Sequence, residues 1–164
     1  MVKLKNNTLI IQMNIVKYIE QYDENNIFYC DPIKNNVMNN SNFIRIIYST
    51  PLFVLNGINL FLSFNDINVE KYYNKYKCSF NISAHKDIIE YIRIIEANLL
   101  VNVNIMCKNP QYKIYDQIKN GNIKFFSENI EKISNNLFML KISGIWETET
   151  HYGVTYKFLK INHP

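Results

Sequence analysis

Aromatic and basic side chains recur together in three stretches of this chain, and they form its most distinctive chemical pattern. The first stretch, "KYYNKYK", contains no acidic residue. A single nucleic-acid strand needs flat apolar faces for unstacked bases, worth about 1–3 kcal/mol each, and cations along its phosphates. The pattern offers both, and its candidate residues are Lys71, Tyr72, Lys75 and Lys77, then Tyr112 and Lys113 in "QYKIY", and finally Trp146 and Lys157.

The same pattern also has a simpler explanation. Asparagine, isoleucine, lysine and tyrosine are heavily used while glycine and proline are scarce, as AT-rich codons would produce. Tyrosine is a good strand former, so any exposed strand could show this alternation without a ligand. An alternative is therefore a structural or interaction subunit whose aromatic residues dock on another protein.

Motifs typical of enzymes are absent from the sequence. It has no glycine-rich phosphate loop, no GxSxG elbow and no paired-cysteine or HExxH spacing. His85, His151 and His163 are scattered, and Glu147 and Glu149 flank a predicted turn, where acids are usually solvated. We expect a protein that is not an enzyme and has no catalytic residue, metal or cofactor.

Length and composition favour one globular domain spanning residues 1–164. The chain has 164 residues, a net charge of +4 and a pI near 8.8, which suits an anionic partner without proving one. Cys30, Cys78 and Cys107 are widely spaced among apolar neighbours, which favours reduced, buried thiols. Without a signal peptide or an apolar run long enough for a membrane span, we expect an intracellular protein that is not bound to a membrane.

The chain consists mainly of short β-forming segments, which are separated by polar, asparagine-rich segments. "NFIRIIYST" reads as a strand that presents Arg45, and "YKCSFNI" alternates as a half-buried strand. In "LFVLNGINLFLSF", the pair Asn56-Gly57 indicates a hairpin, with a bulged bend as the competing interpretation. A further strand is expected at residues 124–126.

One segment reads clearly as a helix. In "SAHKDIIEYIRIIEANLL", Ile88, Ile92, Ile95 and Leu99 recur at steps of three and four, with Ser83 as the N-cap. "PQYKIYDQIKNG" is either a second short helix or an extended segment. The N-terminal "TLIIQMNIVKYIEQY" is ambiguous between strand and helix.

The closing ribbon, residues 141–161, reads as a hairpin with "TETH" as its loop. Glu147 would then face Tyr152, Trp146 would face Gly153, and Gly144 would face Thr155. Ile145, Val154, Tyr156 and Phe158 would form an inner apolar seam, with Trp146 and Lys157 on the outer face. A slip of one residue would exchange the faces, so the opposite assignment stays open.

Short antiparallel strands around one principal helix predict a mainly β fold, an OB-like Greek-key barrel with a possible second short helix. In order, "NFIRIIYSTPLFVLNGINLFLSF", "YNKYKCSF", "RIIEANLL" and "LKISGIWETETHYGVTYKF" resemble the OB-fold single-stranded-DNA-binding proteins of large eukaryotic DNA viruses. Those proteins are similar to the single-stranded-DNA-binding proteins of short-tailed phages. The most specific parts of the resemblance are "LNGI" and "SGIWE…YGVTYKF".

The resemblance implies a protein that coats single-stranded DNA in viral replication, recombination or repair, in the host nucleus or at a cytoplasmic viral replication site. It implies contacts from Arg45, Lys75, Lys77, Tyr112, Trp146 and Lys157, and partners among replication or recombination proteins. The phage proteins end in an acidic tail that recruits partner enzymes, whereas this chain ends "KFLKINHP", which puts such recruitment in doubt. The sequence decides neither homo-oligomer formation nor DNA over RNA, so an RNA-binding OB domain is a further alternative.

Overall fold

The structure is a computed structural model that describes residues 17–126 and 136–161. Strands dominate these residues, and most of them are short. Their bounds are β1 Lys17–Tyr18, β2 Ile27–Tyr29, β3 Ile33–Lys34, β4 Asn42–Ser49, β5 Val54–Asn56, β6 Ile58–Ser63, β7 Asn68–Tyr72, β8 Lys75–Ser79, β9 Asn109–Gln111, β10 Asn122–Phe126, β11 Leu137–Glu147 and β12 His151–Lys160.

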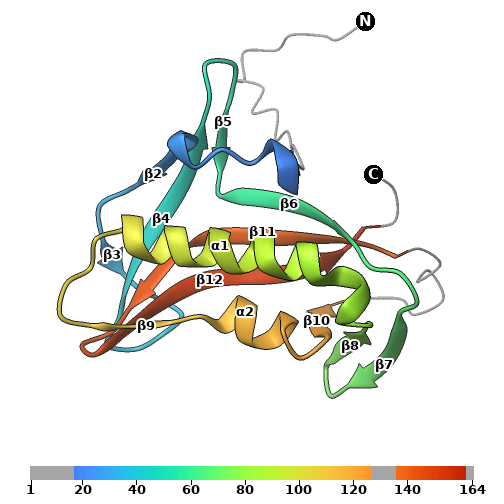
Figure 1. Cartoon of the computed structure of the whole chain (residues 1–164). Coiled ribbons are helices and arrows are strands. Elements are labelled where there is room, and N and C mark those ends of the chain that lie inside the picture. Colours follow the sequence, from blue (N-terminus) through green and yellow to red (C-terminus); the bar gives the residue numbers. More distant parts are fainter. Residues whose placement is uncertain (1–16, 127–135, 162–164) are drawn as a thin grey trace, which may run out of the picture.

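Two α-helices accompany the strands, α1 (Lys86–Asn102) and α2 (Lys113–Ile118). Three short 3-10 turns complete the elements: η1 Ile19–Gln21, η2 Glu24–Asn26 and η3 Ser83–His85. Figure 1 shows both helices on the same side of the sheet, with α1 running across β11 and β12. The prediction of a mainly β fold with one principal helix and a second short one is confirmed.

The sheet is open, whereas the sequence predicted a closed barrel. Its main path runs β1-β6-β11-β12-β10-β8-β7, and β4 branches from β11 with β2, β3 and β5 beside it. β1 and β7 form the two ends of this path. Because α1 and α2 cover the apolar face, the sheet buries its core without closing on itself.

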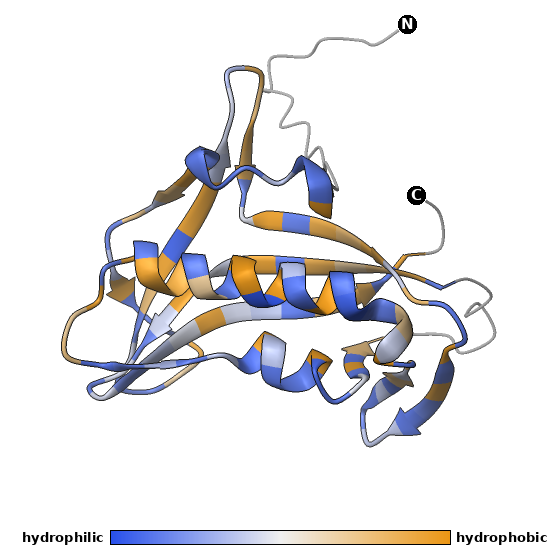
Figure 2. Ribbon diagram, in the orientation of Figure 1, coloured by the Kyte–Doolittle hydropathy of each residue, from blue (hydrophilic) through white to orange (hydrophobic). Residues whose placement is uncertain are grey.

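The core lies between the sheet and the helices. Of the predicted helix stripe, Ile92, Ile95 and Leu99 are buried and Ile88 is half-buried. Figure 2 shows apolar ribbon segments concentrated on the long strands and on one side of α1. The predicted N-cap was wrong: Ser83 lies in η3, and its backbone N–H donates to the side-chain oxygen of Asn81 at 2.9 Å.

A buried carboxylate joins the two helices. Glu96 of α1 is fully buried, and its oxygens accept the backbone N–H groups of Ile114 at 3.0 Å and Tyr115 at 2.8 Å. These are donors of the first turn of α2, which have no partner inside that helix. Burial raises the pKa of the Glu96 carboxyl above its ordinary value, although both hydrogen bonds act in the opposite direction.

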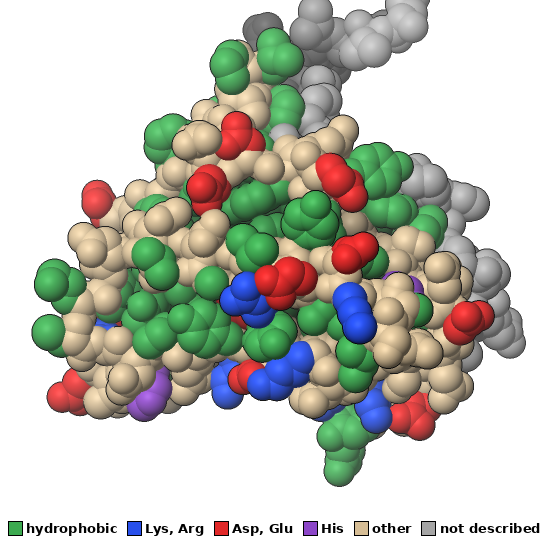
Figure 3. All heavy atoms as spheres, in the orientation of Figure 1, with side chains coloured by type: hydrophobic (Ala, Val, Ile, Leu, Met, Phe, Trp, Pro, Cys, Tyr) green, Lys and Arg blue, Asp and Glu red, His purple; other side chains and the backbone are tan. Residues whose placement is uncertain are grey.

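The outer surface of the helices carries mixed charge. Arg93 pairs with Glu90 on α1 at 2.6 Å, and Lys119 pairs with Asp116 beside α2. Figure 3 shows acidic and basic side chains interspersed over this face of the molecule. Both pairs are exposed and three residues apart, so each adds little to stability.

The Asn56-Gly57 pair forms a bend, so the hairpin prediction was wrong and the bend of the competing interpretation is confirmed. β5 pairs with β4, whereas β6 pairs with β11 and β1. Gly57 has a φ of 89°, and a Cβ at this position would collide with the carbonyl oxygen of Ile142. Only glycine meets both demands, because it tolerates positive φ and has no side chain.

The remaining expectations have mixed outcomes. The half-buried strand at β8, the strand at β10 and the helical form of α2 are confirmed. Cys78 is buried as predicted, but Cys30 is only half-buried and Cys107 is exposed. The ambiguous N-terminal stretch falls mostly outside the described residues, as does His163. In the described part of the chain, no helix combines the length and apolarity that a membrane crossing requires.

Candidate nucleic-acid interface

The hairpin of β11 and β12 has the register that the sequence predicted. Glu147 lies opposite Tyr152, Trp146 opposite Gly153, and Gly144 opposite Thr155. In its loop, the Thr148 N–H donates to the carbonyl of His151 at 2.8 Å. The fixed loop determines which side chains share a face.

The inner and outer faces are also as first assigned. Ile145, Val154 and Phe158 are buried beneath the helices, while Lys157 is exposed on the other side. We call this other side, away from α1 and α2, the open face. Tyr156 belongs to the inner seam but is only half-buried, and its hydroxyl donates to the backbone carbonyl of Lys113 at 3.2 Å. Burial raises the pKa of Tyr156 to about 12.

Two aromatic rings on the open face rest on glycines. A Cβ on Gly153 would stand 2.7 Å from Cζ2 of Trp146 and 2.9 Å from Cε2 and Nε1, so the indole lies against the backbone. A Cβ on Gly144 would stand 2.6 Å from Cζ of Phe43. Phe43 of β4 lies directly opposite Trp146 of β11, so the two side chains are neighbours across the strands.

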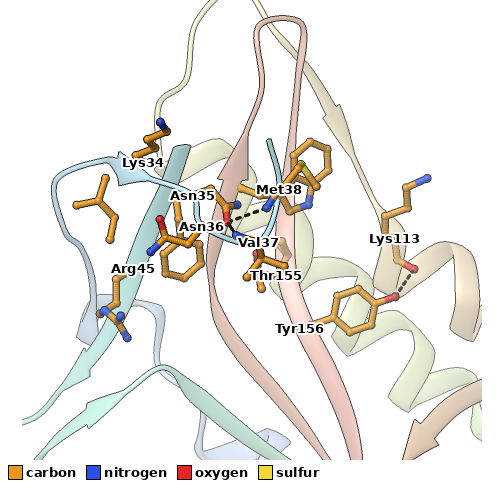
Figure 4. Close-up of a pocket in the computed structure, with 13 residues that line it drawn as sticks. Lys34, Asn35, Asn36, Val37, Met38, Arg45, Lys113, Thr155 and Tyr156 are labelled. Carbon is orange, nitrogen blue, oxygen red and sulfur yellow. Dashed lines mark hydrogen bonds between the residues drawn. The ribbon is translucent and has the colours of Figure 1, made fainter. Parts of the chain in front are cut away.

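These rings line a groove of about 640 Å³, which we call the aromatic groove. The segment after β3 forms one of its walls, and Figure 4 shows Asn35, Val37 and Met38 there. The side-chain oxygen of Asn35 holds this segment by accepting the N–H groups of Val37 at 2.9 Å and Met38 at 3.2 Å. The groove is lined by Ile33, Lys34, Asn35, Asn36, Val37, Met38, Phe43, Arg45, Lys113, Trp146, Val154, Thr155 and Tyr156.

The charge of the aromatic groove is entirely positive. Arg45, Lys34 and Lys113 are among its lining residues, which include no carboxylate. The Arg45 guanidinium lies 5.8 Å from the centre of the Phe43 ring and donates one hydrogen bond, of 2.8 Å, to Asn56. Most of its five N–H donors are therefore available to a ligand or to water.

Arg45 owes its position to a junction of three strands. β4 pairs with β11 as far as Arg45, opposite Gly144, and pairs with β5 from Ile47 onward. β11 shifts register between Ile142 and Gly144, beside the bend at Gly57. The "LNGI" and "SGIWE" segments, far apart in the sequence, thus meet at the end of the aromatic groove.

The structure brings some of the predicted site residues together and separates others. Arg45, Lys113 and Trp146 all line the aromatic groove, although Figure 4 shows the Lys113 side chain leading away from Tyr156. Lys71 lies on the opposite side of β7 from Tyr72, and Tyr112 packs partly buried against the core. The others lie on the open face of the sheet: Tyr72, Lys75, Lys77 and Lys157.

The residues of the β7–β8 hairpin already have partners within the chain. Lys77 Nζ lies 3.3 Å from Oε1 of Glu70. The Lys75 ammonium lies 4.8 Å from the centre of the Phe126 ring. The Lys124 ammonium lies 4.3 Å from the centre of the Tyr72 ring. Cations above rings are attracted to the π face, so these contacts order the side chains on the open face.

Several residues of the aromatic groove were not predicted. Phe43 could have been identified from the sequence, because it stands two residues before Arg45 and therefore lies on the same face of the strand. Val37 and Met38 lie in "KNNVMNNSN", one of the asparagine-rich segments that separate the predicted strands. Val37 is 97% exposed, and an apolar residue so open to solvent is the signal that the structure adds.

Other polar groups are engaged in structural contacts. His85 is buried, with Nε2 accepting the N–H of Asn65 at 2.9 Å and Nδ1 2.8 Å from the carbonyl of Asn81. Glu147 is not simply solvated as predicted, since it pairs with Lys108 at 2.6 Å. Among residues 17–126 and 136–161, no three His, Cys, Asp or Glu side chains gather as a metal site would require.

No protein-family model, curated protein or solved structure matches this chain. The resemblance to viral and phage proteins therefore stays a prediction.

Proposed function

We propose that this protein binds single-stranded DNA without sequence specificity, through the aromatic groove and the cations beside it. A role in viral DNA replication, recombination or repair follows from the sequence resemblance alone. The proposal names a non-enzymatic protein whose ligand is a polymer of flat bases and charged phosphates.

The main observation behind the proposal is the position of the Trp146 indole on the sheet. The indole rests on Gly153 with Phe43 as its neighbour across the strands, and both line a groove that solvent can enter. A base stacked on an aromatic side chain contributes about 1–3 kcal/mol, whichever base it is. Stacking of this kind explains binding without sequence preference.

The charge around the groove supports the same ligand. Arg45, Lys34 and Lys113 are among the lining residues of the groove, which include no carboxylate. Phosphates attract cations at every nucleotide, so a groove of this charge suits a nucleic-acid backbone. A neutral or basic peptide would gain less from these cations than a nucleic acid would, so a protein that docked here would need an acidic surface.

Fluorescence anisotropy of labelled oligo-dT against a duplex of equal length, at about 50 and 200 mM salt, tests the proposal. We expect tight, salt-sensitive binding to the single strand, weak binding to the duplex, and quenching of Trp146, the single tryptophan of the chain. Oligo-U compared with oligo-dU of the same length separates RNA from DNA preference, because the two differ only in the 2′-hydroxyl that a protein can read.

Two results would contradict the proposal. Absence of binding to every oligonucleotide would mean that the groove serves another ligand, such as a partner protein. Binding without a change in Trp146 fluorescence would mean that the strand lies elsewhere on the surface. Trp146→Phe is the matched variant: it keeps a stacking ring, so binding should persist while the fluorescence signal disappears.

A further inference from the structure

Four lysines stand in one line across four neighbouring strands of the open face. Lys141 of β11 lies directly opposite Lys157 of β12, and Lys124 of β10 lies directly opposite Lys77 of β8. β10 and β12 are parallel and pair Phe125 with Phe158, so Lys124 and Lys157, one residue earlier on each strand, are also neighbours. We call these four residues the lysine row.

The lysine row faces away from the helices. The residues on either side of Lys141, Leu140 and Ile142, are fully buried in the core, so Lys141 itself points to the open face. Lys157 is exposed, and the other three are half-buried. This arrangement contrasts with the helix surface, where lysines and arginines pair with acids three residues away.

Little within the described residues neutralises this charge. The row ends at Glu70 of β7, which pairs with Lys77, and at the uncharged Asn59 of β6, which lies opposite Lys141. Neighbouring strands are about 4.8 Å apart, and like charges placed directly opposite one another destabilise a sheet. An arrangement that costs stability in the free protein is relieved when an anion with several charges binds.

A second line of side chains runs beside the lysine row, two residues further along each strand. It begins with Phe61 of β6 and Met139 of β11, continues through Leu159 of β12 and Phe126 of β10, and reaches the Lys75–Tyr72 pair. Phe126 is 53% exposed. Aromatic and apolar faces thus accompany the cations at a spacing of about 7 Å along the strands.

We propose that the lysine row binds the phosphates of a single nucleic-acid strand as it leaves the aromatic groove. This inference rests on the proposed function and extends the site across the sheet. Trp146 lies opposite Gly153, and Lys157 is four residues further along the same face of β12, about 13 Å away. The strand therefore passes from stacking in the groove to a cationic track over β11, β12, β10 and β8.

The test compares oligo-dT of 3 nucleotides with oligo-dT of 12, which is long enough to occupy the aromatic groove and the lysine row together. For each length, Trp146 fluorescence reports groove occupancy, and affinity is measured across a salt series. The variant carries Lys141→Gln with Lys157→Gln. The matched control carries Lys86→Gln with Lys119→Gln, which removes the same charge from the helix side.

We expect the dependence of log K on log salt to be steeper for the 12-mer than for the 3-mer. In the variant, the salt dependence of the 12-mer should be shallower, with a slope smaller in magnitude by about 1.4. Each of the two lost phosphate contacts on a single strand contributes about 0.7. The 3-mer slope and the Trp146 signal should not change. Acetylation of the wild-type lysines, mapped by mass spectrometry, should show Lys141 and Lys157 protected by the 12-mer but not by the 3-mer.

The outcomes separate the two proposals. If neither oligonucleotide quenches Trp146 or binds, the proposed function itself fails. A different outcome would contradict the lysine row alone. In that outcome both oligonucleotides bind and quench Trp146, but the 12-mer salt slope is the same in the variant and in the control. Lys141 and Lys157 are then also acetylated to the same extent with the 12-mer bound as with the 3-mer bound. The acetylation experiment needs no variant, so it decides the matter even if a substitution disturbs folding.

Discussion

The indole of Trp146 lies against Gly153 so closely that no other residue fits there without displacing it. A Cβ at position 153 would stand 2.7 Å from the ring atom Cζ2, a separation that real side chains do not reach. The absence of a side chain at Gly153 therefore lets the only tryptophan in the chain pack against the backbone.

Gly153→Ala should lift the indole from the sheet. The added methyl group overpacks the contact, and overpacking costs about 1–3 kcal/mol of stability. We expect a lower unfolding midpoint in urea, a shifted emission maximum of Trp146, and weaker binding of oligo-dT. Unchanged emission and unchanged binding would show that the position of the indole does not depend on a glycine at position 153.

Gly144→Ala is the comparison for this prediction. Its Cβ would collide with the backbone carbonyl of Ile44, which cannot move without breaking the pairing of β4 with β11. We expect Gly144→Ala to lose more stability than Gly153→Ala. A ring can rotate away from a clash, whereas a paired backbone cannot.

Arg45→Gln should weaken binding of single-stranded DNA and reduce its salt dependence. Arg45 lies in the acid-free groove beside Phe43, and one phosphate contact on a single strand accounts for a slope of about 0.7. The measurement is a salt titration of oligo-dT affinity. Arg93→Gln is the control, because Arg93 lies on the helix surface and pairs with Glu90. Equal slopes in both variants would exclude Arg45 from the interface.

Removal of one like-charge pair should stabilise the free protein. Lys141 and Lys157 lie directly opposite each other, and such pairs cost roughly 0.2–1 kcal/mol. Lys141→Gln should therefore raise the free energy of unfolding by an amount in this range at low salt. The gain should shrink as salt screens the repulsion. A loss of stability at low salt would show that the ammonium makes a favourable contact within the folded chain.

Glu96 predicts a specific dependence of stability on pH. Burial raises the carboxyl pKa in the folded state, so the folded protein holds this proton more readily than the unfolded chain, whose glutamate pKa is about 4.3. The contribution of Glu96 to stability is then full below this unfolded value and is lost as the pH rises through the raised folded pKa.

The advantage of the wild type over Glu96→Gln should accordingly be larger at pH 4 than at pH 7, as measured by urea unfolding at both values. The glutamine retains an oxygen for one N–H donor of α2 and carries no charge. If the advantage instead grows with pH, the hydrogen bonds from Ile114 and Tyr115 outweigh burial, and the folded pKa is lowered.

The three cysteines should react with thiol reagents in a fixed order. Cys107 is exposed, Cys30 is half-buried, and Cys78 is fully buried. Burial also raises the pKa of Cys78 to about 11, so it carries almost no reactive thiolate at pH 8. Labelling with a disulfide reagent, followed by peptide mapping, should modify Cys107 first and Cys78 only in urea. Modification of Cys78 in the folded protein would contradict this arrangement.

The parts of the fold that were predicted well depend on residues close together in the sequence. The register of β11 and β12 follows from a short loop, and the glycine opposite Trp146 was visible in the sequence. The helix stripe of Ile92, Ile95 and Leu99 follows from its spacing alone. Local geometry determines both features, which is why the sequence reveals them.

The parts that were missed depend on contacts between distant segments. A closed barrel was predicted from short antiparallel strands around one helix, but β4 branches from β11, and no local pattern specifies this branch. Glu96 stands four residues after Ile92, on the buried side of α1, yet an acid is ordinarily read as exposed. Its partners, the N–H groups of α2, become visible only when the two helices pack together.

The position of β11 at the centre of the sheet has a consequence for how the chain folds. β11 pairs with β4, β6 and β12, yet it begins at Leu137, long after β4 ends at Ser49 and β6 ends at Ser63. During synthesis the earlier strands leave the ribosome without their principal partner, and unpaired strand edges are prone to aggregation. Because these long-range pairings must form together, we expect slow, late folding, and a chain cut before β11 should be insoluble.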